Sequence, residues 1–554
     1  MTVAEVKQAA FADDLCGFVD ALVALAHTDV YWGRQLNAVR EAVELGKLPW
    51  RVKAAVELSE RLSSVAGENA VALLDYVIDY LLVDEGRLVS LPDALAILGI
   101  AAKYWEFHGY VEMEQLGTTV LKAGGTLDPE VVAVMRRTAA VPGNKPLKKF
   151  VAGLKEPLLN LGEPWADRAL ADLSTLDQAW RELVAHAATA TGDAPTPEWE
   201  QEGLGLLATG GPDRAREVIL GWLALIGRPR TLALRNRGGD DLEHRPDPYN
   251  AMVLRGLVWL LGLLPPDARL SRYLADLAET NLRKVPGMGP GNRPVAEGAI
   301  HALSHMDSME AVAQLVRLAA RVTHRRAAQE IDTAIRAKAK ALQATREQLL
   351  DFAVPSYGLT EVGRCVRRFG DDTGILRIEG TRASIHWRNG AGMTLGSPPT
   401  AVKLGFPEQL KEFRESAKEL GKTLTALTSV LQRQLAAGQP WRYGTWRALV
   451  LDHVVVGALA RRLLWRVDAR LCGYTAGALR PLDDDRSAPA AGGALLQAGD
   501  AARVQLWDPG TSPADEVAVA WEWLARHGIA QPFPQIVGGY THSQPRLDRR
   551  ATPG

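Results

Sequence analysis

The sequence has few cysteines, almost no net charge and no long hydrophobic run. Its three cysteines, Cys16, Cys365 and Cys472, lie far apart, which argues against a disulfide framework or a cysteine zinc site and favours a reducing compartment. The 64 Lys and Arg residues nearly balance the 65 Asp and Glu residues of the 554-residue chain, so no overall field attracts phosphate backbones or anionic lipid. The most apolar stretch, 252–264, is interrupted by Arg255 and is too short to span a bilayer. These absences predict a cytoplasmic protein that does not enter a membrane.

Recognisable catalytic motifs are missing as well. No serine stands in a G-x-S-x-G sequence, and no cysteine or serine lies beside a histidine in a known nucleophile motif. Glu297, His301 and His305 are spaced four apart on one expected helix, so all three side chains could face one metal ion. The pattern lacks the zincin glutamate and an evident fourth ligand, which favours an ordinary repeat-helix face and leaves metal binding as the alternative. We expect no catalytic residue, cofactor or metal, and we favour a protein that is not an enzyme.

Helical periodicity is abundant in the first 350 residues. Apolar residues recur there at helical spacing, interrupted by short turns that contain Gly, Pro or Asp. The clearest amphipathic stretches are 3–26, 49–65, 70–82, 91–105 and 165–185. With 47% hydrophobic and 23% charged residues, the chain is able to bury real cores. We predict a mainly α protein that begins with a helical array over 1–190.

A weak internal repeat follows this array. Residues 256–261 align with 298–303 at an offset of 42, and the next helix of each pair aligns at the same offset, Leu270 with Val312 and Leu274 with Val316. HEAT and armadillo repeats have periods of about 40 to 47 residues, and each helix pair must stack on a neighbour to bury its apolar face. We therefore predict a HEAT-like helical repeat solenoid over 212–350.

The pattern changes after residue 350. Apolar and polar residues alternate in 374–378 and 383–387 with Gly380 between them, which predicts a β-hairpin. Two short helices near 443–451 and 455–465, short strands, and a helix that begins after Pro513 are expected further on. We predict a smaller α+β C-terminal domain over 351–540 and a flexible tail over 541–554.

A long heptad helix over 406–437 is expected inside this C-terminal domain, with Pro407 at its start and Gly438 after its end. Its apolar residues follow an alternation of four and three steps: Phe406, Leu410, Phe413, Ala417, Leu420, Leu424, Leu427 and Leu431. Such a narrow stripe predicts a partner helix, either in the chain or in another subunit. The oligomeric state is left open.

The densest basic stretch is 317–340. Its basic residues are Arg317, Arg321, His324, Arg325, Arg326, Arg336, Lys338 and Lys340. Glu330 and Asp332 dilute this charge, and no aromatic residues are interleaved, so a solvated helix face is favoured over a nucleic-acid site.

Several segments, taken in order, resemble the bacterial family called domain of unknown function 4132. They are 295–303, 354–359, 406–437, 441–446, 460–465 and 531–535. The most specific element is Gln531-Pro532-Phe533 with Gln535. The family-signature residues are Tyr357, Gly358, Trp441, Trp446, Trp465, Gln531, Pro532, Phe533 and Gln535. The resemblance covers roughly residues 285 to 540.

This resemblance implies partners rather than a reaction. The family includes proteins labelled molybdate-metabolism regulators and is associated with MoxR-type AAA+ ATPases and von Willebrand A proteins, whereas it has no established catalytic residues. The chain lacks the WGR domain that members often carry, which weakens a nucleic-acid role, and it ends soon after Gln535, which implies a shortened or divergent member.

The favoured hypothesis is a non-catalytic scaffold or adaptor that presents a helical-repeat surface to a protein partner, such as an AAA+ ATPase or a von Willebrand A protein. One alternative is an enzyme of unrecognised type in the C-terminal domain. A second alternative is a nucleic-acid binder that uses the basic helix over 317–340.

Overall fold

The computed structural model describes residues 3–28, 33–44, 46–83, 89–107, 112–236, 242–285, 289–483 and 496–536. The tail predicted over 541–554 lies outside the described residues. The chain divides into two compact units, the first formed by 1–265 with 277–302 and the second by 266–276 with 303–554. The three-part division expected from the sequence stays a prediction. No helix in the described ranges is long and apolar enough to cross a membrane.

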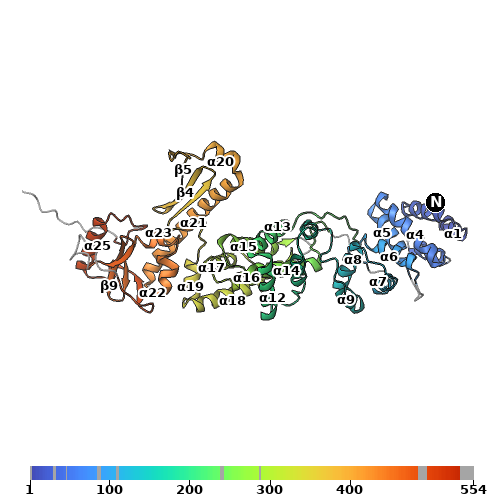
Figure 1. Ribbon diagram of the computed structural model, residues 1–554, viewed down its shortest axis with the longest axis horizontal. Helices are drawn as coiled ribbons and strands as arrows, with labels where there is room; N and C mark the ends of the chain where they lie inside the picture. The colour runs from blue at the N-terminus through green and yellow to red at the C-terminus, as the bar shows by residue number, and fades with distance from the viewer. Residues whose placement is uncertain are drawn as a thin grey trace, which may run out of the picture. The chain divides into compact units, whose positions relative to one another are not determined.

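The first unit is built from helices, drawn in blue to green in Figure 1. They are α1 (Val3–Phe11), α2 (Leu15–Ala26), α3 (Gly33–Glu44), α4 (Leu48–Arg61), α5 (Glu68–Leu81), α6 (Leu91–Ala101), α7 (Met113–Lys122), α8 (Pro129–Ala140), α9 (Lys145–Ala152), α10 (Pro164–Leu173), α11 (Gln178–Ala187), α12 (Pro197–Gly210), α13 (Pro212–Leu223) and α14 (Pro248–Gly262). Each unit takes part of α15 (Ala268–Asn281) and α16 (Arg293–His305), and the two short strands β1 (Lys284–Val285) and β2 (Gly289–Pro290) lie between these helices.

Two of the long helices expected from periodicity are each split in two. The stretch 3–26 breaks because Asp13 adopts a left-handed φ of 56°, and the Asp14 carboxylate accepts the Gly17 N–H at 3.0 Å and so caps α2. The stretch 165–185 breaks between Leu173 and Gln178. Apolar spacing continues across both turns, so a prediction based on periodicity alone is wrong at these two points.

The predicted helical repeats are confirmed. The offset of 42 residues aligns α14 with α16, and it aligns α15 with α17 (Met309–Ala319). Gly256 lets α14 approach α11 closely, because a Cβ at this position would lie 2.1 Å from the carbonyl oxygen of Ala187. Helix α14 also lies against α16, where a Cβ on Gly262 would lie 2.8 Å from the Cβ of Ala302. Small residues thus set the helix spacing.

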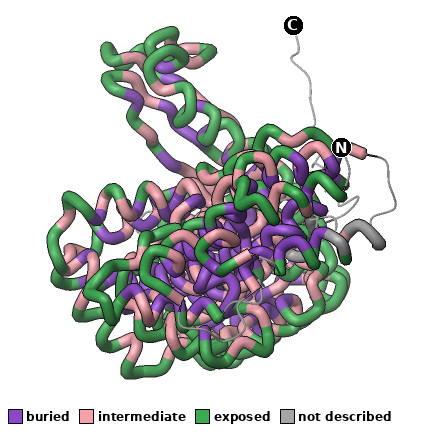
Figure 2. Tube along the Cα trace, turned by 90° about the vertical axis from the view of Figure 1, so that its right-hand side faces the viewer, coloured by how far each residue is buried: buried purple, intermediate pink, exposed green. Residues whose placement is uncertain are grey.

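A continuous apolar core runs through α1 to α9, from Val6 to Leu147. Buried and exposed residues alternate along these helices, as the purple and green segments of Figure 2 show. Helix pairs of this length are stable because their apolar faces are packed against one another.

The second unit combines helices with two antiparallel sheets, which confirms the predicted α+β C-terminal region. Its helices are α17, α18 (Arg325–Ala341), α19 (Arg346–Phe352), α20 (Thr400–Gly405), α21 (Pro407–Ala437), α22 (Tyr443–Trp446), α23 (Gly457–Ala460) and α25 (Ala514–Arg526). The strands of the first sheet, in the order β3-β4-β5-β6, are β3 (Arg364–Phe369), β4 (Asp372–Glu379), β5 (Arg382–Arg388) and β6 (Thr394–Leu395). The second sheet has the order β10-β9-β8-β11-β7 and contains β7 (Trp441–Arg442), β8 (Trp465–Val467), β9 (Arg470–Thr475), β10 (Ala478–Pro481) and β11 (Arg503–Leu506).

The predicted β-hairpin is confirmed as β4 and β5. Glu379 lies opposite Arg382, so the turn contains two residues, and Gly380 adopts the φ of 64° that such a turn requires. Strand β3 extends this hairpin on one side, and β6 extends it on the other.

Helix α21 begins at Pro407 and ends at Ala437, and Gly438 caps it with a left-handed φ of 60°. Six of the eight residues of the predicted stripe are buried, and Leu420, Leu424 and Leu431 are completely enclosed, whereas Phe406 and Ala417 are partly exposed. The prediction of a partner helix is wrong for the first half of α21, because Phe413 contacts Phe369 of β3 and Trp387 of β5, with ring centroids 5.8 and 6.1 Å apart. Figure 1 shows β4 and β5 beside α21. An alternation of four and three steps indicates a narrow buried face, and a sheet covers such a face as well as a helix does.

Most tryptophans of the C-terminal part form core contacts. Trp441, Trp446, Trp465, Trp507 and Trp523 are buried, whereas Trp521 is 53% exposed. Trp465 lies in β8 and not in the expected helix over 455–465. Its ring packs edge-on against that of Trp446, with centroids 4.9 Å apart.

Candidate functional site

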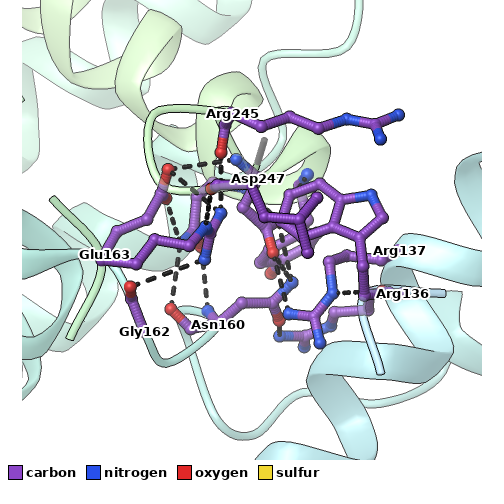
Figure 3. A network of polar contacts seen from close by, with 12 residues as sticks. Arg136, Arg137, Asn160, Gly162, Glu163, Arg245 and Asp247 are labelled. Carbon is purple, nitrogen blue, oxygen red and sulfur yellow. Dashed lines mark hydrogen bonds and ion pairs between the residues drawn. The ribbon is translucent and has the colours of Figure 1, made fainter. Parts of the chain in front are cut away.

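A buried cluster of charged groups joins α8, the loop between α9 and α10, and the start of α14 in the first unit (Figure 3). Arg137 of α8 forms an ion pair with Asp247 at 3.2 Å, and the two side chains are only 1% and 0% exposed. The Arg137 guanidinium also donates to the carbonyl oxygens of Trp105 at 2.6 Å and Tyr104 at 3.3 Å. Asp247 accepts further hydrogen bonds from the Asn160 side-chain amide at 3.0 Å and from the backbone N–H of Tyr249 at 3.0 Å.

Glu163 extends this cluster. Its carboxylate accepts the Asp247 N–H at 3.0 Å and the Asn250 side-chain amide at 2.8 Å, and it lies 3.8 Å from the Arg230 guanidinium. Burial and the nearby negative charge of Asp247 raise the pKa of Glu163 to about 7. Because the members of the cluster satisfy one another, we interpret it as the device that fixes α8 and α14 together rather than as a reactive site.

A groove of about 990 Å³ lies within the second unit. Its walls come from the first turn of α15, from α17, from the loop 353–358, from β3 and from α21. Among the described residues that line it there is no histidine. Its titratable lining consists of Arg, Lys and Glu side chains with Tyr357 and Cys365.

The groove carries an excess of basic side chains. Seven lining residues are basic: Arg269, Arg272, Arg317, Arg321, Arg367, Lys418 and Lys422. Four are acidic: Glu310, Glu412, Glu415 and Glu419. Some of these charges are paired, as in Arg367 with Glu412 at 2.9 Å and Lys422 with Glu419 at 2.7 Å. Seven positive and four negative charges leave an excess of three positive charges, although the whole chain has a net charge of -1.

Tyr357 and Gly358, which the sequence analysis expects to be signature residues, form a turn in the wall of the groove. Both adopt left-handed backbone conformations, with φ of 53° and 80°. The Tyr357 hydroxyl shares a hydrogen bond of 2.7 Å with the Thr423 hydroxyl of α21, and the adjacent Ser356 N–H donates to Glu310 of α17 at 2.9 Å. Burial raises the pKa of the Tyr357 phenol, so this bridge stays neutral at physiological pH. The turn therefore holds the two helical walls of the groove together.

The candidate metal pattern lies on α16 as expected. The Glu297 carboxylate accepts the Arg293 Nε–H at 2.6 Å, and the His301 ring tilts against that of Trp259 at 5.8 Å between centroids. In the part of the chain that the structure describes, no group of three or more His, Cys, Asp or Glu residues is placed to hold a metal ion. The structure thus does not gather Glu297, His301 and His305 into a ligand set.

Three of the eight basic residues of the stretch 317–340 form ion pairs with acidic neighbours. Arg317 pairs with Asp276 at 2.6 Å, Arg326 with Glu330 at 3.1 Å and Arg336 with Asp332 at 2.8 Å. Pairing of this kind is typical of a solvated helix face.

The remaining signature residues have structural positions in the second unit. Gln535 is buried, and its side-chain amide donates to the carbonyl oxygens of Leu464 at 3.1 Å and Trp507 at 2.9 Å, while its oxygen accepts the Leu464 N–H at 2.8 Å. Gln531 in turn donates to the same oxygen of Gln535 at 2.7 Å, and Phe533 is buried beside them. The segment 531–535 therefore attaches the end of the described chain to the strands β8 and β11.

Replacing Gln535 with alanine is expected to lower the free energy of unfolding of the second unit by about 2 kcal/mol. The change removes the partner of the buried Leu464 N–H and of the Trp507 carbonyl, whereas the Leu464 carbonyl still accepts the Trp507 N–H at 3.1 Å. Chemical denaturation monitored by tryptophan fluorescence measures this change. Gln531→Ala, which removes a more exposed amide, is the matched control and should cost less. Equal losses for the two variants would contradict the role given to Gln535.

The buried side chain of His453 is expected to make the free energy of unfolding depend on pH. Its Nδ1 accepts the N–H groups of Val455 at 3.1 Å and Val456 at 3.3 Å. Burial lowers the pKa of His453 from 6.5 to about 4, while a hydrogen bond to the backbone of Val354 opposes this shift. Between these pH values the unfolded chain binds the proton and the folded chain does not, so stability should fall as the pH drops from 6.5 to 4.

This dependence can be measured as the unfolding free energy of the wild type and of His453→Asn across that pH range. Asparagine retains an acceptor for the two N–H groups but does not titrate. The variant should show a shallower fall than the wild type, and identical slopes would contradict the assignment to His453.

Sequence reasoning did not find two parts of these sites. Arg137 and Asp247 are separated by 110 residues, so no local pattern links them; Asp247-Pro248, however, is a recognisable start of a helix. The basic side chains of the groove come from α15, α17, β3 and α21, and only the fold brings them together.

The comparisons with known proteins concern the C-terminal part of the chain. No curated protein and no solved structure matches the sequence. Residues 392–546 match a family model described as Domain of unknown function (DUF4132). The matched region contains α21 and the signature residues from Trp441 to Gln535, whereas Tyr357 and Gly358 precede it. In this C-terminal part, the chain is similar to that family of unknown function.

Proposed function

We propose that the protein is a non-catalytic adaptor of the cytoplasm that binds a protein partner through the groove of its second unit. The observation that supports this function is the groove itself, which has a volume of about 990 Å³ and is lined by charged side chains from several separate segments. Binding sites are typically concave and place a few polar groups to fix the orientation of the ligand. The two halves of the groove are linked by the Tyr357 hydroxyl, so its shape is set before a partner arrives.

The resemblance to the family of unknown function suggests which partners to test first. MoxR-type AAA+ ATPases and von Willebrand A proteins are the classes that it implies, and a role near molybdate metabolism is part of the same proposal. The nucleic-acid alternative is less well supported, because the ion pairs of Arg317, Arg326 and Arg336 reduce the positive charge that phosphates would meet.

The experiment is affinity capture of the full chain from the organism that encodes it, compared between two charge-reversed variants. Arg269→Glu with Lys418→Glu changes two exposed residues that line the groove. Arg325→Glu with Lys340→Glu makes the same change in net charge on exposed residues that do not line it. We expect the first variant to lose the captured partner and the second to retain it.

Retention of the partner by both variants would contradict the groove as the binding site. Loss by the second variant alone would favour the basic stretch 317–340. Circular dichroism of both variants checks that each remains folded.

A further inference from the structure

Strand β3 is an open edge of the first sheet. It pairs only with β4 in the described chain, as the strand order β3-β4-β5-β6 shows. Phe369 lies opposite Asp372 across a turn of two residues, so these two residues exchange both of their backbone hydrogen bonds. In an antiparallel pair, hydrogen-bonded positions recur at every second residue, so Arg367 and Cys365 are also hydrogen-bonded to β4. The intervening residues Val366 and Arg368 therefore direct their N–H and C=O groups away from β4. Across the described residues, neither of them has a further backbone hydrogen bond on that side.

The open part of β3 faces the groove. Cys365, Val366 and Arg367 are among the lining residues, and the side chain of Val366 is 48% exposed. At Arg364, the first residue of the strand, the edge is not open, because the backbone of Arg364 exchanges two hydrogen bonds of 3.0 Å with that of Glu361. An open strand edge is a template for an extended peptide, which pairs through its main chain.

The charge beside this edge indicates the chemistry of such a peptide. Seven basic and four acidic side chains line the groove, and Arg317 is also paired with Asp276, which lies outside the lining set, so two positive charges remain in excess. Lys418 of α21 and Arg269 of α15 are exposed and line the groove, whereas Arg367 of β3 is paired with Glu412 at 2.9 Å. Long-range attraction between a positive groove and a negative segment accelerates the encounter and orients the partner.

We propose that the groove binds an extended acidic segment of the partner protein, which adds to β3 as a further antiparallel or parallel strand. This inference rests on the proposed adaptor function and specifies how the partner is held. Main-chain hydrogen bonds to Val366 and Arg368 supply the register, and glutamate or aspartate side chains of the segment meet the basic walls. A nucleic acid lacks the alternating amide N–H and C=O groups that this edge demands.

The test uses the full chain and a fluorescein-labelled peptide of alternating glutamate and valine, with a peptide of alternating lysine and valine as its control. Fluorescence anisotropy gives the dissociation constants at low and physiological salt. We expect the acidic peptide to bind with a dissociation constant below about 1 mM and to weaken with added salt, and the basic peptide not to bind. Hydrogen exchange is carried out on the full chain, which is then digested for analysis. The backbone amides of β3 should exchange more slowly when the acidic peptide is present.

Val366→Pro removes the outward N–H of β3 and leaves its hydrogen bonds to β4 in place, because an edge strand tolerates proline at such a position. It should weaken binding of the acidic peptide by about tenfold or more, whereas Val366→Ala, which retains the N–H, should bind like the wild type. Circular dichroism shows whether Val366→Pro is folded. Arg269→Glu with Lys418→Glu tests the charge requirement independently and should also weaken binding.

Unchanged binding by Val366→Pro would overturn strand addition, as would unchanged hydrogen exchange of β3. Three results would contradict the preference for an acidic segment: equal binding of the basic peptide, tighter binding of a single-stranded DNA 20-mer, or no binding of the acidic peptide at about 1 mM. If the peptide tests fail but Arg269→Glu with Lys418→Glu still loses the partner in affinity capture, the adaptor function stands and strand addition does not. If the peptide tests fail and this variant also retains the partner, the adaptor function is contradicted as well.

Discussion

Replacing Arg137 with methionine is expected to lower the free energy of unfolding of the first unit by about 3–5 kcal/mol. Methionine fills a similar volume, but it leaves the completely buried Asp247 carboxylate without its ion-pair partner. The carbonyl groups of Tyr104 and Trp105 lose their donor at the same time. Urea denaturation followed by circular dichroism measures the loss.

Two further variants separate the buried charge from the loss of packing. Arg168→Met breaks an ion pair with Asp172 in which the arginine is 64% exposed, so it should cost less than about 1 kcal/mol. Asp247→Asn added to Arg137→Met should recover part of the loss, because the uncompensated charge is gone and asparagine still caps α14. A loss for Arg137→Met no larger than that for Arg168→Met would contradict the structural role of the cluster.

Introducing a charge at Leu420 is expected to cause a similarly large loss of stability, in this case of the second unit. Leu420 is 0% exposed in the buried stripe of α21. Leu420→Asp removes an apolar side chain and places a carboxylate there without a partner, which should destabilise the second unit by about 3–5 kcal/mol. The melting temperature measured by differential scanning calorimetry reports this change.

Ala426→Asp is the matched control, since residue 426 is exposed on the same helix. It should change the melting temperature little. A melting temperature of Leu420→Asp close to that of the wild type would show that the stripe is not packed as described.

The fold is largely predictable where local signals are strong. Pro407 and Gly438 mark the ends of α21 to within one residue, and Gly380 marks the hairpin of β4 and β5. The prediction fails where apolar periodicity continues through a turn, as at Asp13, or where a heptad stripe meets a sheet, as at Phe413. Periodicity shows which face is buried, whereas the nature of the covering element depends on contacts that are distant in the sequence.

The candidate site is predictable only in part. The resemblance seen in the sequence singles out Tyr357 and Gly358, but the family match begins only at residue 392, and the position of these two residues in a groove wall is not predictable from it. The excess of basic side chains is invisible along the chain because it is assembled from segments as distant as Arg269 and Lys422. The open edge of β3 also depends on the strand order, which no local pattern specifies.

Photo-crosslinking at position 366 tests the central claim most directly, namely that the groove of the second unit holds a protein partner. The full chain, with a photoreactive phenylalanine derivative in place of Val366, is irradiated in cells of the organism that encodes it, and position 426 carries the same group as a control. The account predicts a discrete cross-link to one protein at position 366, through an acidic segment of that protein, and none at position 426. The same cross-links at both positions, or none at position 366, would contradict it.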